Sequence, residues 1–153
     1  MIQRIQSIFL LLASLMLGLV FFFPLAVLVN ENETFTFWYR GLYGNLHENI
    51  VLLEHSTPLA ILYLLILMLC IFSIFLFKLR PVQMKLCIAN IILIIIALGL
   101  TALYLFVIYS DHHAQIHFKI FSAFPILSLV FIVLAYKGIK KDEALVKSVD
   151  RIR

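Results

Sequence analysis

Side chains that can bind metals or transfer protons gather in the polar segment SDHHAQIHFK, which contains Asp111, His112, His113 and His117. If residues 114–118 form a helix, His113 and His117 lie one turn apart on the same face. That spacing suits two imidazole ligands for zinc or copper, and Asp111 lies close enough in sequence to add a carboxylate. The segment therefore raises the hypothesis of a metal site formed by Asp111, His113 and His117.

A second polar segment contains His47, Glu48, Glu54 and His55, and the last two raise the alternative of an acid–base pair. Neither segment has an HExxH or CxxC motif, and the chain has no P-loop, nucleophile elbow or dinucleotide fingerprint. Histidines in polar loops beside a membrane are common. We therefore expect solvated loop residues and assign no metal ligand, no cofactor and no catalytic residue, so the chain is predicted not to be an enzyme.

The remainder of the chain is too apolar for a water-soluble domain. Of 153 residues, 64% are hydrophobic and 13% are charged, and the mean hydropathy is +1.10. Soluble domains usually have about 45–50% apolar and about 25% charged residues. Lipid must therefore surround most of the surface, and residues 1–153 are predicted to form a single integral membrane domain.

Four uncharged apolar runs, at residues 5–29, 59–77, 86–109 and 120–136, predict four transmembrane helices at about residues 5–29, 58–77, 85–109 and 119–136. A helix needs roughly 20 apolar residues, with a range of about 17–25, to cross a bilayer. Strands of a membrane barrel would instead alternate over segments of about 10 residues. The first run continues through FFFPLAVLV without a cleavage site, so we expect an uncleaved helix. The predicted fold class is an all-α four-helix transmembrane bundle.

The positions of Lys and Arg predict the orientation. The extracytoplasmic side, with loops at 30–56 and 110–118, has only Arg40 and, at the start of the fourth span, Lys119, whereas the other side, with the tail at 137–153, has ten basic residues. The ten are Arg4, Lys78, Arg80, Lys85, Lys137, Lys140, Lys141, Lys147, Arg151 and Arg153. This positive-inside bias places both termini in the cytoplasm. The net charge of +4 thus reflects orientation, and we expect no nucleic-acid partner.

The first extracytoplasmic loop contains a strand-like pattern. In residues 34–39, TFTFWY, the aromatic side chains of Phe35, Phe37 and Tyr39 alternate with Thr36 and Trp38. Two glycines follow in RGLYGN and permit turns. We predict a short β-hairpin at the outer end of the bundle, with its aromatic side chains anchored at the membrane interface.

Small and polar residues within the runs predict helix contacts. Asn90 is expected to find a hydrogen-bond partner inside the bundle, because polar side chains join helices in lipid. Cys70 and Cys87 are expected to pack as small apolar residues. Pro125 is expected to kink the fourth helix.

The tail KGIKKDEALVKSVDRIR is predicted to continue helically from the fourth span, although Gly138 would loosen the joint. Ile139, Leu145, Val149 and Ile152 fall roughly along one stripe, and basic residues occupy much of the remainder. Such a helix can lie among lipid headgroups or place its apolar stripe in a partner groove. The candidate docking residues are Lys140, Lys141, Leu145, Lys147, Val149, Arg151 and Ile152.

Both ends of the chain resemble a known family. The opening MIQRIQSIFLLLAS, with FFFP at residues 21–24, and the closing KDEALVKSVDRIR look like small four-span bacterial membrane proteins of unknown function. Members of that family typically open with MIQRIQ and close with a DEALVRSxDRIR-like tail, where this chain has Lys147 in place of Arg. The resemblance implies a bacterial cytoplasmic membrane and brings no activity or catalytic residues.

The residues are compatible with three functions. The leading hypothesis is a small membrane subunit or adaptor that presents its tail to lipid or to a protein partner. The alternatives are an extracytoplasmic metal-binding protein that uses the His/Asp cluster and a passive pore formed by several copies. No Asp, Glu, Lys, Arg or His lies within the apolar runs at residues 5–29, 59–77, 86–109 and 120–136, which argues against ion-coupled transport.

Overall fold

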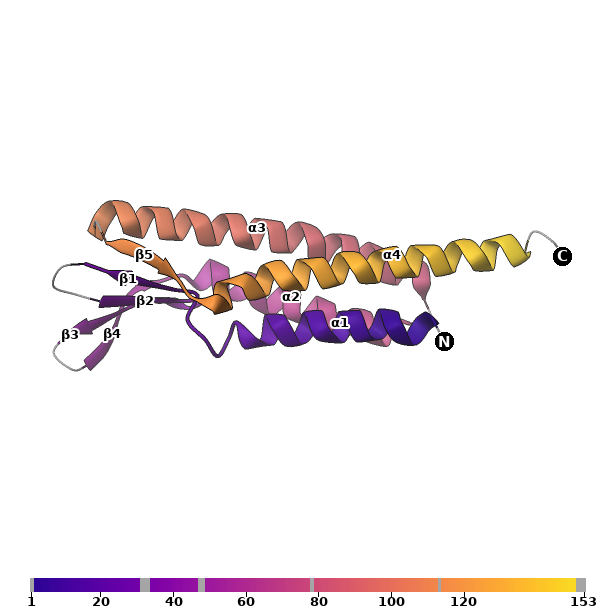
Figure 1. The fold of residues 1–153 in the computed structure, drawn as a ribbon, viewed down its shortest axis with the longest axis horizontal. Coiled ribbons are helices and arrows are strands. Elements are labelled where there is room, and N and C mark those ends of the chain that lie inside the picture. The colour runs from indigo at the N-terminus through magenta and orange to yellow at the C-terminus, as the bar shows by residue number, and fades with distance from the viewer. Residues whose placement is uncertain (1, 31–33, 47–48, 78, 113, 151–153) are drawn as a thin grey trace.

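The computed structural model of the protein describes residues 2–30, 34–46, 49–77, 79–112 and 114–150. In these residues a long bundle of helices ends in a β-sheet, and the start of α1 and the end of α4 both lie toward the opposite end (Figure 1). The helices are α1 (Ile2–Leu19), α2 (Thr57–Phe75), α3 (Arg80–His112) and α4 (Phe124–Asp150). The prediction of a mainly helical protein is therefore confirmed, with a larger β component than expected.

Three segments of the described helices are long and apolar enough to cross a membrane: Thr57–Phe75, Arg80–Asp111 and Ile120–Val146. In α1 the apolar part, Ile5–Leu19, is shorter. The helices are apolar on their outer surfaces as well as inside, since Ile61, Met68 and Phe106 are each more than 60% exposed. A helix that is apolar all round is typical of a lipid environment.

The first apolar run is not one helix from 5 to 29, and that prediction is wrong at its C-terminal end. Here α1 ends at Leu19 in a tightened turn, and strand β1 (Ala26–Val29) follows. Pro24 cannot continue a helix, because it lacks an N–H and clashes with the preceding turn. The residues after it are then free to pair with strands on both sides. An apolar run alone does not distinguish these outcomes.

Five antiparallel strands form one sheet with the order β4-β3-β2-β1-β5. The additional strands are β2 (Thr34–Trp38), β3 (Gly41–Leu46), β4 (Asn49–His55) and β5 (Gln115–Phe118). The predicted hairpin is confirmed as β2 and β3. It becomes part of a larger sheet because β1 follows α1 and β5 follows α3, and both are brought to the same end of the bundle. An isolated hairpin would be marginal in stability.

Gly41 begins strand β3 in a conformation that other residues rarely adopt, with φ of 155°. A Cβ atom at this position would overlap the backbone carbonyl oxygen of Glu54 on the neighbouring strand. The turn between β2 and β3 therefore requires a glycine here.

The aromatic face of β2 points into the bundle. Phe35, Phe37 and Tyr39 are at most 8% exposed, and the Phe37 ring lies 6.4 Å from that of Tyr104 on α3. For these three side chains the predicted interfacial anchoring is wrong. They are used instead to fix the sheet on the helix ends, because burial in the protein core removes them from the membrane interface.

The sheet is also tied to α2 by hydrogen bonds from Ser56, the N-cap residue of that helix. Its hydroxyl donates to the carbonyl oxygen of Tyr39 at 3.2 Å, and its backbone N–H donates to the carbonyl oxygen of Arg40 at 2.8 Å. Pro58 lies in the first turn of α2, where no N–H is needed. The sheet and the bundle are thus joined by buried polar contacts.

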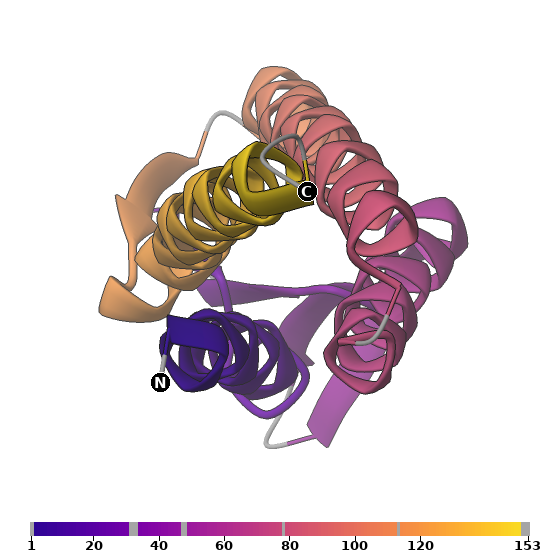
Figure 2. The same cartoon turned by 90° about the vertical axis from the view of Figure 1, so that its right-hand side faces the viewer.

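The helices form a closed ring in which α1 packs on α2 and α4, and α3 packs on α2 and α4 (Figure 2). Cys70 and Cys87 are fully buried inside it, as predicted. The thiol of Cys70 donates to the carbonyl oxygen of Leu10 at 3.5 Å. Asn90 is also fully buried, but neither atom of its amide has a hydrogen-bond partner among the described residues. The expected interhelical bond of Asn90 is therefore not made there.

The fourth helical segment begins with a 3₁₀ turn, η1 (Ile120–Ala123), and then continues as α4. Pro125 is the second residue of α4 rather than an interior kink site. A proline in the first helical turn displaces no intrahelical hydrogen bond, which explains its position there.

Candidate functional site

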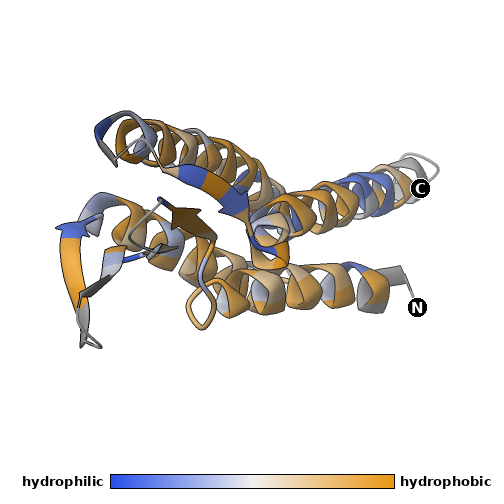
Figure 3. Ribbon diagram, turned by 60° about the vertical axis from the view of Figure 1, so that its left-hand side comes forward, coloured by the Kyte–Doolittle hydropathy of each residue, from blue (hydrophilic) through white to orange (hydrophobic). Residues whose placement is uncertain are grey.

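The predicted tail is the C-terminal part of α4. This helix runs without interruption from Phe124 to Asp150, and its end extends past the N-terminal end of α1 (Figure 1). Figure 3 shows the hydrophilic residues of this helix gathered in its last turns. The tail is thus a continuation of a bundle helix.

Gly138 does not loosen this joint. A Cβ atom at Gly138 would lie 3.1 Å from Cγ of Gln6 on α1, so the missing side chain lets the two helices approach closely. Gln6 is 6% exposed and Ile139 is fully buried beside it. The small residue therefore serves helix packing, as is common for helices in membranes.

An ion pair that the sequence did not indicate fixes the base of the tail. Nη2 of Arg80, at the start of α3, lies 3.1 Å from Oδ2 of Asp142 on α4. The two side chains are 25% and 14% exposed, so water screens the pair only in part. The residues are 62 positions apart in sequence, which is why helical periodicity could not reveal their contact.

The candidate docking residues have different positions relative to this base. Lys140, Lys141 and Leu145 are exposed on α4, and Val146 adds an exposed apolar neighbour. Ile139 is buried in the bundle and is not available to a partner. Lys147 and Val149 lie in the last turns of α4, while Arg151 and Ile152 lie outside the described residues. The apolar surface on the described part of the tail is therefore shorter than the predicted stripe.

The metal-site hypothesis assumed a helix at residues 114–118, and that assumption is wrong. Residues Gln115–Phe118 form strand β5, because they pair with β1 in a register that places His117 opposite Val27. Asp111 lies near the end of α3, and His113 lies outside the described residues. Within the described ranges, no group of three His, Cys, Asp or Glu side chains is arranged to hold a metal ion.

The Glu54/His55 pair is also separated by strand geometry. Both residues lie in β4 and are exposed. Successive side chains of a strand point to opposite faces, and a cavity that both residues line has a volume of only about 10 Å³. His47 and Glu48 lie outside the described residues.

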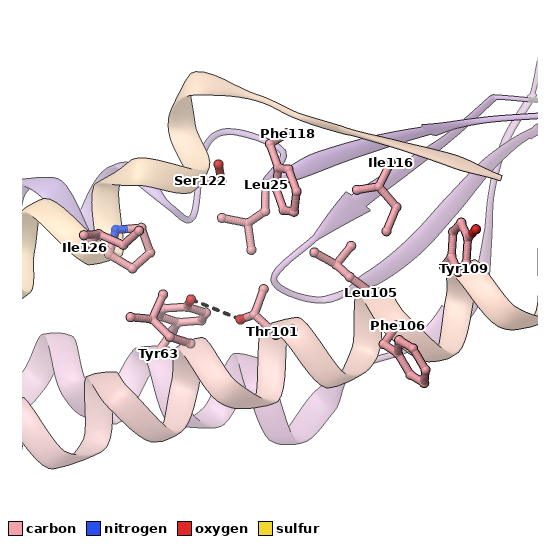
Figure 4. A pocket seen from close by; sticks show the side chains of 13 residues that line it. Leu25, Tyr63, Thr101, Leu105, Phe106, Tyr109, Ile116, Phe118, Ser122 and Ile126 are labelled. Atoms are coloured by element: carbon pink, nitrogen blue, oxygen red, sulfur yellow. Dashed lines mark hydrogen bonds between the residues drawn. The ribbon is translucent and has the colours of Figure 1, made fainter.

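A cavity of about 620 Å³ is the principal feature that the sequence did not predict. It lies between α3 and the start of α4, beneath β5 and η1 (Figure 4). Its buried floor is formed by Leu25, Tyr63 and Leu105. Because five elements supply its lining, only their assembly creates it.

Comparison with known protein families assigns the chain to one family. The family model described as a domain of unknown function (DUF4293) matches residues 2–152. The chain therefore belongs to this uncharacterised family. Comparison with curated proteins and with solved structures gave no match.

Proposed function

We propose that the protein is a four-span integral protein of a cytoplasmic membrane and acts as a non-enzymatic small subunit or adaptor. In this proposal the tail of α4 projects into the cytoplasm and presents an apolar and basic surface to a protein partner. The single observation that carries it is the unbroken continuation of α4 beyond the end of α1, with Leu145 and Val146 exposed.

The geometry of α1 supports a fourth span, although its helix is short. Its 18 residues correspond to about 27 Å at 1.5 Å per residue, against a hydrocarbon core of about 30 Å. Its inner side, including Leu10 and Leu17, is buried, whereas Ile8 and Leu11 on its outer side are each 54% exposed. A helix packed between α2 and α4 with such an outer surface requires lipid beside it.

The orientation follows from charge and from the position of the chain ends. The start of α1 and the end of α4 lie at the end of the bundle away from the sheet (Figure 1). Among the described residues, the parts of α1, α3 and α4 at that end have Arg4, Arg80, Lys85, Lys137, Lys140, Lys141 and Lys147. By the positive-inside rule, this end faces the cytoplasm. The sheet then lies on the extracytoplasmic side.

Single cysteines test this topology. Val51 on β4 and Leu145 on α4 are 44% and 48% exposed, so Val51→Cys and Leu145→Cys should react with a maleimide. Cys70 and Cys87 are fully buried and provide a low background. An impermeant maleimide added to intact cells should label Val51→Cys, and only permeabilised cells should label Leu145→Cys. Labelling of both variants from the same side would refute the four-span topology.

The direction of the tail favours a partner over the lipid surface. All of α4 is one helix of 27 residues, or about 40 Å, which exceeds a hydrocarbon core of about 30 Å. An amphipathic helix that lies among headgroups must run parallel to the membrane plane. Since no break occurs at Gly138, the tail continues along the direction of the span and leaves the membrane. Its exposed face suits a groove with apolar and acidic residues.

Photocrosslinking in intact membranes tests the adaptor role. A photoreactive amino acid at Leu145 should give a discrete protein adduct, because this side chain lies on the proposed docking surface. The matched control is Val130, which is equally exposed but lies in the middle of the same helix. A Lys140→Glu/Lys141→Glu variant should reduce the Leu145 adduct without changing the Val130 pattern. Identical adducts at Leu145 and Val130 would refute the adaptor proposal.

A further inference from the structure

We infer that the cavity between α3 and α4 binds one hydrocarbon chain of an anionic phospholipid from the outer leaflet. This inference rests on the four-span topology of the proposed function and is independent of the tail and its partner. Its basis is the position of the cavity, the chemistry of its lining and a nearby cation.

The cavity has a buried floor and an exposed aromatic rim. Leu25, Tyr63 and Leu105 at the floor are at most 5% exposed, whereas Phe106 and Phe118 at the rim are 68% and 67% exposed. Figure 4 shows Phe118 on the β5 side and Phe106 on the α3 side of the side chains that line the cavity. A molecule that enters therefore contacts side chains that lipid surrounding the bundle does not reach.

Three of the hydroxyl groups of the lining, those of Tyr63, Thr101 and Ser122, are already hydrogen-bonded within the protein. The hydroxyl of Thr101 donates to the carbonyl oxygen of Ala97 at 2.7 Å, and the hydroxyl of Tyr63 then donates to Thr101 at 3.3 Å. Ser122 donates its hydroxyl to the carbonyl oxygen of Lys119 at 2.7 Å. A polar ligand would lose its hydration without gaining partners for most of its groups. The lining thus favours a hydrocarbon chain.

The size of the cavity excludes a partner helix. A spanning helix is about 10–12 Å across and about 30 Å long, several times the volume of the cavity. The observed volume of about 620 Å³ lies instead within the range of about 300–1,000 Å³ that holds small molecules. A single lipid chain can enter directly from the bilayer, because the opening lies beside apolar, exposed parts of α3.

The charge beside the cavity favours an anionic headgroup. Among the described residues of 20–56 and 110–123, the Lys and Arg residues are Arg40 and Lys119, and the acidic residues are Glu54 and Asp111. Lys119 is exposed and directly follows the rim residue Phe118. Its backbone N–H donates to the carbonyl oxygen of Leu25 at 3.3 Å, so the backbone that carries this cation is fixed to the floor of the cavity. A phosphate at the surface can then approach the ammonium group while its chain fills the cavity.

Photoreactive phospholipids test this inference on the full-length protein in liposomes. Each lipid carries a diazirine in one acyl chain and either a phosphatidylglycerol or a phosphatidylcholine headgroup, and adducts are mapped by peptide mass spectrometry. We expect adducts to concentrate on the lining, including Leu105, with phosphatidylglycerol favoured about fivefold because of Lys119. Lys119→Gln should remove that preference.

Filling the cavity provides the matched variants. Ala102 lines the cavity, and Leu103 is 62% exposed on α3 outside it. Ala102→Trp should lower labelling of Leu105 at least about tenfold, because it displaces two or more methylene groups from the cavity. Leu103→Trp should leave the labelling unchanged.

Three outcomes would overturn the inference. Adducts spread evenly over the exposed side of α3, or unaffected by Ala102→Trp, would mean that only surrounding lipid is sampled. Equal labelling by both headgroups would refute the role of Lys119. Labelling by a diazirine polyprenyl phosphate but not by either phospholipid would refute the assigned source of the chain. The cysteine-labelling pattern and the Leu145 crosslink report separately on topology and on the tail.

Discussion

The guanidinium group of Arg80 and the carboxylate of Asp142 lie 3.1 Å apart and join the first turn of α3 to the tail of α4. Asp142 lies one turn beyond Gly138, where a Cβ atom would lie 3.1 Å from Cγ of Gln6 on α1. The base of the tail is therefore held by two different helices, one through an ion pair and one through packing. These contacts hold α4 in place where it continues as an unbroken helix past the end of α1.

Loss of this ion pair is predicted to loosen the tail without unfolding the bundle. Because the pair is partly screened by water, Asp142→Ala should cost only about 0.5–1 kcal/mol. Hydrogen exchange of the amides at residues 142–150 should become faster, while exchange in the middle of α3 should not change. The exchanged pair Arg80→Asp/Asp142→Arg should recover the slow exchange. Equal exchange in all variants would mean that the ion pair does not hold the tail.

The close approach at Gly138 gives a second prediction. Gly138→Leu should destabilise the protein in micelles by about 1–3 kcal/mol, because the new side chain meets Gln6 in a packed contact. The control is Gly99→Leu on α3, where a Cβ atom has no neighbour within 4 Å. Gln6→Ala should restore part of the loss in the Gly138→Leu background. If both leucine variants unfold at the same denaturant concentration, Gly138 is not a packing contact.

Asn90 should be a cost to stability. Its side chain is fully buried, and neither amide atom is paired with a described residue. Replacing an unsatisfied buried polar group removes a desolvation penalty of about 1–3 kcal/mol, so Asn90→Leu should raise the midpoint of unfolding. The comparison is Ile94→Asn, one turn further along the same buried face of α3, which should lower it. A large destabilisation by Asn90→Leu would reveal a partner for the amide.

Gly41 is predicted to be indispensable for the sheet. In Gly41→Ala, the new Cβ atom would overlap the carbonyl oxygen of Glu54, and the positive φ would be unfavourable for alanine. The backbone would have to shift to remove both conflicts. We expect a loss of more than about 1 kcal/mol, since such backbone conformations cost about 1–3 kcal/mol for other residues. Gly18→Ala in α1, with no atom within 4 Å of the new Cβ, should be neutral or slightly stabilising. Equal stability of the two variants would contradict the conformational role of Gly41.

The sequence predicted the helical framework and the first hairpin, because these depend on local signals. Continuous apolar runs indicated helices suited to lipid, and the alternation at residues 34–38 indicated strand β2, which is confirmed. The burial of Cys70 and Cys87 followed from their position within those runs. Each of these inferences uses residues that are close in sequence.

Contacts between distant residues were decided only by the tertiary structure. Val27 pairs with His117, so the end of the first apolar run and residues 115–118 form two paired strands. The helical turn that would have placed His113 and His117 on the same face is therefore not formed. The Arg80–Asp142 ion pair and the cavity under β5 likewise require several elements to meet. Residue types and periodicity fix how each segment can bury its apolar side chains, but strand partners and cavities depend on which segments assembly brings together.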